Sequence, residues 1–167
     1  RGARFRTAPG VTLPEVVAQV CRGIEWVYRN LATAIVLCGH SSGSHLAACA
    51  LPRTRRVKSA LLVSRIYDLL PVRLSARNEY VRLDEKLEHE YSPIRQVDRI
   101  GCPVTVAWAE HEAAEFYRQS REFASALKVA DKLTAALVGK GLNHFEIIET
   151  LADPASPLGR AALNMLQ

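Results

Sequence analysis

The chain has 167 residues, of which 49% are hydrophobic and 23% charged. This length suits one domain with a buried core, and this balance excludes a disordered chain. The formal net charge is +5, but the densest basic run, residues 53–58, lacks the interleaved aromatic residues of a nucleic-acid-binding surface. We expect this run to be a solvated loop. The longest apolar runs cannot cross a bilayer, and no signal-peptide pattern opens the sequence. We therefore expect neither a nucleic-acid nor a membrane partner, although the natural start could lie upstream of Arg1.

Four cysteines are spread along the chain at positions 21, 38, 49 and 102. They form no CxxC pair and show no metal-ligand spacing with histidine, so we expect no bound metal and no cofactor. Cys38 and Cys102 adjoin apolar segments and are predicted to be small buried hydrophobic residues. This cysteine usage is typical of a reducing compartment, which predicts a cytoplasmic location.

The first third of the chain predicts a helix, a strand and a second helix. After a Pro9-Gly10 turn, Thr12 can cap a helix that has Pro14 in its first turn and ends near Asn30. The short apolar run 34–38 is typical of a strand buried on both faces. A tight turn over 39–43 then leads into a helix over 44–51, and residues 60–63 predict the next strand.

The remainder predicts further alternation after an interruption. Residues 64–91 carry many charges and no strand pattern, so we expect an insertion of loops and short helices. Strands are then predicted over 103–108 and 133–138, helices over 115–129, 145–151 and 158–167, and a loop over 139–143. Strands that alternate with helices predict a single α/β domain over 1–167, with a mostly parallel sheet covered by helices on both faces. In such a sheet the chemistry lies at the carboxyl ends of the strands.

The strongest motif is Gly39-His40-Ser41-Ser42-Gly43, which matches GxSxG between a predicted strand and a predicted helix. The two glycines allow a sharp turn that holds Ser41 in a strained, exposed position, as a nucleophile requires. The helix that follows directs its first N–H groups at the site, and the backbone N–H of Ser42 can bind a developing oxyanion. The alternative is a glycine-rich turn with an incidental serine.

A serine nucleophile needs a base, and His144 is the best placed of the five histidines. It follows the last predicted strand after a short glycine-rich loop, which puts it at the same sheet edge as Ser41. We expect His40 to pack beside the turn, His45 to lie on the next helix and His89 to be solvated. Chain order requires a carboxylate between serine and histidine, after the strand that ends at Trp108.

Three acids follow that strand. Glu112 is preferred because it lies in the loop beyond the strand end, and Glu110 stays open as an alternative. Glu115 is expected to begin the next helix, where an acidic side chain is favourable.

These segments together resemble a known family. The elbow and its helix, Ile66-Tyr67-Asp68-Leu69, the 107–119 stretch, Asn143-His144-Phe145 and the segments 8–14 and 153–159 are similar to the kynurenine formamidases (arylformamidases) and related esterases. The resemblance implies an α/β-hydrolase fold and cleavage of a formamide or ester of a small, aromatic acyl substrate through an acyl-enzyme. It also implies that Ser41 is the nucleophile, His144 the base and Glu112 the triad acid, within tryptophan catabolism.

The resemblance also has departures. Glu112 stands where the family usually has aspartate, and Arg65 stands where we expect glycine. No HGG-type oxyanion segment occurs, and Arg1 aligns near the end of the family's fourth strand, so the amino-terminal strands of the fold are expected to be missing. The chain could be an excerpt of a longer protein, depend on a partner or be degenerate. A general carboxylesterase, an inactive fragment that acts by protein association and a homodimer are the alternatives left open.

Overall fold

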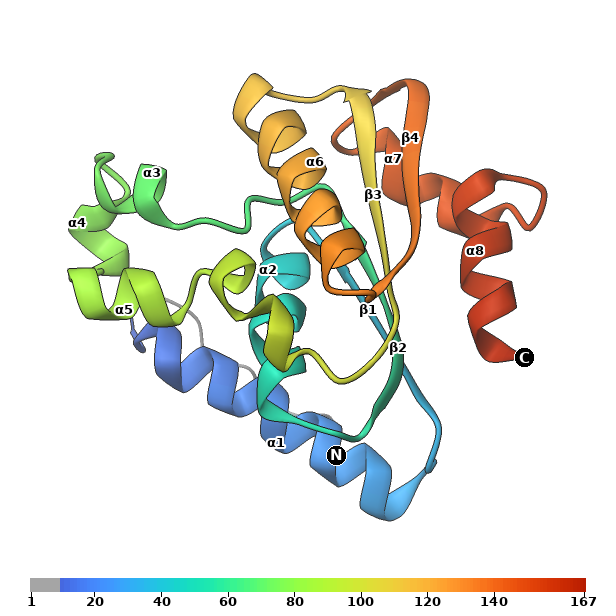
Figure 1. Ribbon diagram of the computed structural model, residues 1–167, viewed down its shortest axis with the longest axis horizontal. Coiled ribbons are helices and arrows are strands. Elements are labelled where there is room, and N and C mark those ends of the chain that lie inside the picture. The colour runs from blue at the N-terminus through green and yellow to red at the C-terminus, as the bar shows by residue number, and fades with distance from the viewer. Residues whose placement is uncertain (1–9) are drawn as a thin grey trace.

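The computed structural model describes residues 10–167 and contains one parallel sheet (Figure 1). The strand order is β1-β2-β3-β4, and each strand pairs in parallel with its neighbour. The strand bounds are β1 Ile35–His40, β2 Val57–Val63, β3 Val104–His111 and β4 Leu133–Asn143. The predicted parallel α/β sheet is confirmed. The expected turn at Pro9 and the aligned positions Arg1 and Ala8 lie outside the described residues.

Eight α-helices and three 3₁₀ helices connect and cover these strands in the described part of the chain. The α-helices are α1 Leu13–Asn30, α2 Ser42–Ala50, α3 Leu70–Arg73, α4 Asn78–Val81, α5 Glu85–Glu90, α6 Ala114–Val129, α7 Glu146–Glu149 and α8 Pro157–Leu166. The 3₁₀ helices are η1 Leu51–Arg53, η2 Pro93–Arg99 and η3 Thr150–Ala152.

The start of α1 follows from its sequence. The Thr12 hydroxyl accepts a hydrogen bond from the Glu15 backbone N–H, and the Glu15 carboxylate accepts one from the Thr12 N–H, which forms a capping box. Pro14 lies in the first turn of α1. A backbone N–H at this position would have no acceptor within the helix, so proline, which lacks this group, is tolerated. These local signals explain why the predicted and observed bounds of this helix agree.

The two faces of the sheet are covered by different helices. Figure 1 shows α1, α2 and α6 on one side and α7 and α8 on the other. The first side holds the largest core cluster, which includes Leu62, Val104 and Phe123. The second side holds a smaller cluster from β2, β3, α7 and α8, which includes Val63 and Leu158. Burial of apolar surface on both faces is the main stabilising term of this arrangement.

Strand β1 differs from its prediction as a strand buried on both faces. Within the described residues it pairs only with β2, and the helices that cover the second face lie over β2, β3 and β4. Cys38 is consequently exposed, and the prediction of a buried thiol at this position is wrong. Cys102 is buried as expected, and burial raises the pKa of its thiol to about 11.

Strand β4 is longer than predicted. Residues 139–143, expected to be a loop, continue the strand because Gly139 pairs with Ala109 and Asn143 pairs with His111. The register shifts between Ala109 and His111, and Gly141 has a positive φ of 71° there. An irregularity of this kind absorbs the extra residues without ending the pairing.

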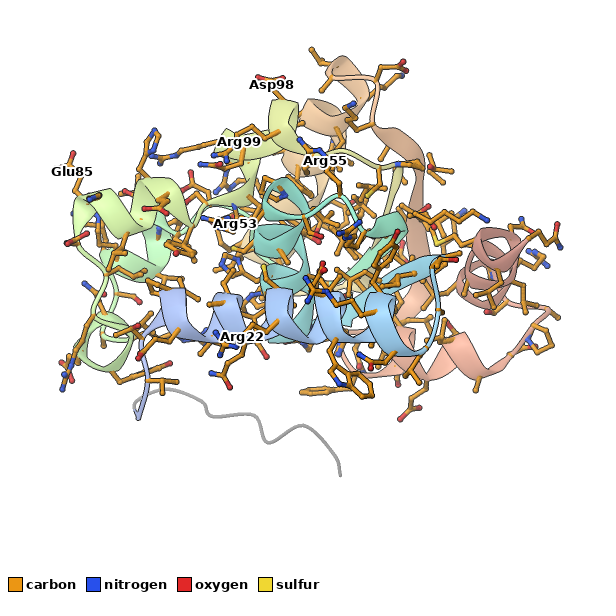
Figure 2. All side chains as sticks on the ribbon, turned by 90° about the horizontal axis from the view of Figure 1, so that it is seen from below. Arg22, Arg53, Arg55, Glu85, Asp98 and Arg99 are labelled. Carbon is orange, nitrogen blue, oxygen red and sulfur yellow. The ribbon has the colours of Figure 1, made fainter. Side chains whose placement is uncertain are left out.

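The basic run 53–58 is more ordered than the expected solvated loop. The Arg53 guanidinium donates to the Cys49 carbonyl at 2.6 Å and lies over the Tyr91 ring. Arg55 donates to the Arg99 carbonyl at 3.1 Å, and the side chains of both residues are labelled in Figure 2. These arginines are held against the protein by its own backbone and rings.

Candidate active site

The serine of the GxSxG motif lies at a strained turn between β1 and α2. Ser41 has φ 52° and ψ −125°, and its backbone N–H donates to the Val63 carbonyl at 3.0 Å. A positive φ is uncommon for a residue with a Cβ and persists only where the surrounding structure holds it. The preceding strand and following helix are the context that a nucleophile elbow requires.

Of the two glycines in the motif, only Gly39 lies so close to other atoms that a side chain there would clash. A Cβ at position 39 would lie 2.5 Å from the Gly43 carbonyl oxygen, nearer than real Cβ atoms come to other atoms. A Cβ at position 43 would meet nothing within 4 Å. The expectation that the sharp turn needs both glycines is therefore wrong for Gly43, which leaves room for a Cβ of its own. Its backbone is what a Cβ at position 39 would meet.

Ser42 begins α2 directly after the candidate nucleophile. The first N–H groups of a helix have no partner within it, and the helix dipole makes this end favourable for negative charge. The Ser42 N–H thus has the chemical character expected of an oxyanion donor.

His144 lies beside Ser41 although 103 residues separate them in sequence. It follows the last residue of β4, and its Nε2 is 3.1 Å from the Ser41 Oγ. The other ring nitrogen, Nδ1, is 3.1 Å from Oε2 of Glu112, which follows the last residue of β3. An ionised carboxylate can only accept, so Nδ1 carries the proton and Nε2 is left to accept one from the serine hydroxyl.

The two candidate acids have different surroundings. The Glu112 side chain is 1% exposed, whereas that of His144 is 22% exposed. The Glu110 carboxylate instead accepts a hydrogen bond from the Gly141 N–H at 2.8 Å. This bond stabilises the irregular part of β4. The structure therefore brings Glu112, and not Glu110, to the imidazole.

His40 contacts the same imidazole, which the sequence did not indicate beyond a position beside the turn. Its Nε2–H donates to the His144 backbone carbonyl at 2.9 Å, and the two ring centres are 4.8 Å apart. Burial, as the largest cause, lowers the pKa of His40, which favours its neutral form. A neutral donor here can hold the backbone of His144 in place.

Two phenylalanines form the apolar surroundings of the imidazole. The rings of Phe116 and Phe145 lie edge-on to His144, with centre distances of 5.3 Å and 5.1 Å. Phe116 lies on α6, is only partly buried and reaches the site. Spacing along the helix could not identify this contact, because the imidazole is distant in sequence.

The remaining histidines do not join the site. His89 and His111 are exposed. His45 is buried on α2, where its Nδ1 hydrogen-bonds the Ile66 carbonyl at 3.2 Å. Burial, with a smaller effect of the Arg65 charge, lowers the pKa of His45 to about 3.

Residues 10–167 contain no candidate metal site and no candidate membrane-spanning helix. No group of three or more His, Cys, Asp or Glu side chains in this range could hold a metal ion. None of the helices in this range has the length and apolar character needed to span a membrane.

The chain is similar to known proteins in sequence and in fold. No family model matches the chain. Over 97% of its length it is 33% identical to kynurenine formamidases of Salmo salar and Danio rerio, and over 96% it is 26% identical to that of Drosophila melanogaster. The chain spans 60% of the length of each of these relatives.

Solved structures give the same fold. A candidate thioesterase from Silicibacter matches 92% of this chain and 60% of its own with a TM-score of 0.83 at 27% identity. An esterase of Pyrobaculum calidifontis matches 96% of this chain and 63% of its own with a TM-score of 0.76 at 21% identity. The chain has the α/β-hydrolase fold and resembles the kynurenine formamidases and related esterases, as its motifs predicted.

Proposed function

We propose that the protein is a serine hydrolase that cleaves the acyl bond of a small aromatic formamide or ester through an acyl-enzyme. The observation that carries this proposal is the chain of two 3.1 Å contacts from Ser41 through His144 to Glu112. A hydroxyl becomes an effective nucleophile only when a base removes its proton, and a base works best when a third group fixes its tautomer.

In the first half of the reaction the Ser41 Oγ attacks the acyl carbon and its proton passes to His144 Nε2. The carbonyl oxygen becomes an oxyanion, which the Ser42 N–H stabilises. The buried Glu112 carboxylate stabilises the imidazolium that forms. When the intermediate collapses, the bond to the leaving nitrogen or oxygen breaks, and His144 returns the proton to that leaving group.

In the second half a water molecule attacks the acyl-enzyme. His144 takes one proton from the water, the hydroxide adds to the acyl carbon, and the bond to Ser41 Oγ breaks. The imidazolium returns its proton to the serine, and the acid product leaves. Apart from the substrate, these steps consume only one water molecule, and Ser41 and His144 return to their starting states.

The substrate proposal rests on similarity and on the surroundings of the base. Kynurenine formamidases are similar over nearly the whole chain, which makes formylkynurenine the leading candidate and tryptophan catabolism the proposed setting. The rings of Phe116 and Phe145 beside His144 offer an apolar contact to an aromatic substrate. A general carboxylesterase is the second candidate, because several structural neighbours are esterases.

A turnover comparison tests the proposal. The full-length protein is assayed with formylkynurenine and with nitrophenyl acetate, beside a Ser41→Ala control. We expect both substrates to be hydrolysed, with the higher kcat/KM for formylkynurenine, and Ser41→Ala to lose the activity. Preference for the ester would favour the carboxylesterase. Activity that survives Ser41→Ala would contradict the serine mechanism.

A further inference from the structure

An arginine lies beside the site without a role in the steps above. The Ser41 N–H is bonded to the carbonyl of Val63, the last residue of β2, and Arg65 follows two residues later. Its guanidinium carbon is 6.0 Å from the centre of the Phe116 ring, which is 5.3 Å from the centre of the His144 ring. The guanidinium and the imidazole therefore both lie beside the Phe116 ring.

The Arg65 side chain has no anionic partner among residues 10–167. Its Nε is buried without a hydrogen-bond acceptor, and no carboxylate of the described residues forms a salt bridge with it. The neighbouring Ser64 Oγ is also buried without a partner. Partial removal of an unpaired charge from water raises the free energy of the folded protein, so we expect an anionic ligand to pair with this charge.

Burial and a neighbouring positive charge further favour the binding of an anion at Arg65. Burial is the largest cause that lowers its pKa, and the positive charge of Arg77 lowers it further. Two like charges near one another disfavour each other and attract an anion between them. The residue as a whole is only partly buried.

We propose that Arg65 is a specificity-determining residue that binds the terminal carboxylate of a dicarboxylic acid monoester at the Ser41 site, a substrate of the carboxylesterase alternative and not of the formamidase, whose acyl group is only formyl. This inference rests on the proposed serine hydrolase. A guanidinium binds a carboxylate through two parallel N–H···O bonds, which fixes orientation as well as position. The acyl carbon would then lie at Ser41 Oγ while the carboxylate meets the Arg65 guanidinium.

A matched pair of esters tests this role. The mono-nitrophenyl ester of adipate and the nitrophenyl ester of hexanoate have acyl chains of equal length and differ in the terminal carboxylate. We expect Arg65→Gln to lower kcat/KM for the adipate ester by about 10- to 100-fold, since hydrogen bonds to charged groups are worth about 1.5–3 kcal/mol. The hexanoate ester should change less than about twofold, which also shows that the variant is folded.

Two further variants sharpen the comparison. Arg65→Lys keeps the charge and loses the paired geometry, so its kcat/KM for the adipate ester should lie between those of the native protein and Arg65→Gln. Arg22→Gln removes one exposed charge on α1 (Figure 2) and should leave the ratio of the two esters unchanged. An equal fall for both esters in Arg65→Gln, or no change for either, would overturn the proposal.

A binding measurement separates this inference from the proposed function. Calorimetric titration of the Ser41→Ala protein with benzoate and with benzamide requires no turnover. Benzoate should bind more tightly than benzamide, and the added Arg65→Gln change should weaken benzoate binding at least about tenfold without affecting benzamide. Equal binding of the two ligands would reject the role of Arg65 even if Ser41 proves to be the nucleophile.

Discussion

Replacement of Glu112 by glutamine should nearly abolish turnover while leaving the fold intact. The carboxylate is 1% exposed, and its Oε2 lies 3.1 Å from Nδ1 of His144. Glutamine has almost the same shape but carries no charge, and its amide nitrogen can donate to Nδ1. That contact would favour the tautomer with the proton on Nε2, which can no longer accept the proton of Ser41.

The size of the effect follows from this change of tautomer. Loss of the orienting carboxylate in a serine triad lowers kcat about 10⁴-fold, which corresponds to roughly 5.4 kcal/mol of transition-state stabilisation. Glu110→Gln is the matched control, because Glu110 bonds only the Gly141 N–H in this region and its amide oxygen can still accept that bond. We expect Glu110→Gln to keep turnover within about threefold, since exposed charge interactions are weak.

The assay is hydrolysis of nitrophenyl acetate at saturating concentration, with circular dichroism as the check on folding. Glu112→Asp, which keeps the charge on a shorter side chain, should fall between the native protein and Glu112→Gln. If Glu112→Gln stays within tenfold of the native rate, or Glu110→Gln loses more than Glu112→Gln, the assignment of the acid is refuted.

Two further predictions concern stability. Gly39→Ala should lower the free energy of unfolding by about 1–3 kcal/mol, because its Cβ overlaps the Gly43 carbonyl, whereas Gly43→Ala should be neutral or stabilise α2 by up to about 1 kcal/mol. Urea titration distinguishes them, and equal destabilisation would contradict the packing described. The folded-state pKa of His45, about 3, lies below the ordinary 6.5, so its contribution is present above pH 6.5 and is lost as pH falls towards 3. Between pH 6.5 and about 5.5 the native protein should lose about 1 kcal/mol more than His45→Gln, and parallel stability curves would contradict a buried neutral imidazole.

The order of elements could be predicted because local signals in the sequence are strong. The Thr12 cap and Pro14 define the start of α1, and apolar runs mark each strand. What could not be predicted depends on residues distant in sequence. The continuation of β4 past Val138 requires pairing with β3, and the exposure of Cys38 requires knowing which strands the helices α7 and α8 cover.

In the candidate site, too, some contacts could be predicted from the sequence and others could not. Ser41 and His144 follow strand ends, and parallel strands bring their carboxyl ends to one edge, so their meeting was predictable from topology. The preference for Glu112 over Glu110 depended on where β3 ends, and that strand extends three residues beyond the predicted Trp108. The contacts of His40 and Phe116 with His144 join residues distant in sequence, so no local sequence pattern could predict them.

The most direct test of the central claim is the site of covalent modification by a fluorophosphonate. Treated full-length protein is digested and mapped by mass spectrometry, beside Ser41→Ala and His144→Gln. We predict a single adduct on Ser41, none on Ser42 or Ser44, and labelling slowed by orders of magnitude in His144→Gln, since the base activates the hydroxyl. An adduct on another serine, or equal labelling rates with and without the imidazole, would contradict the account.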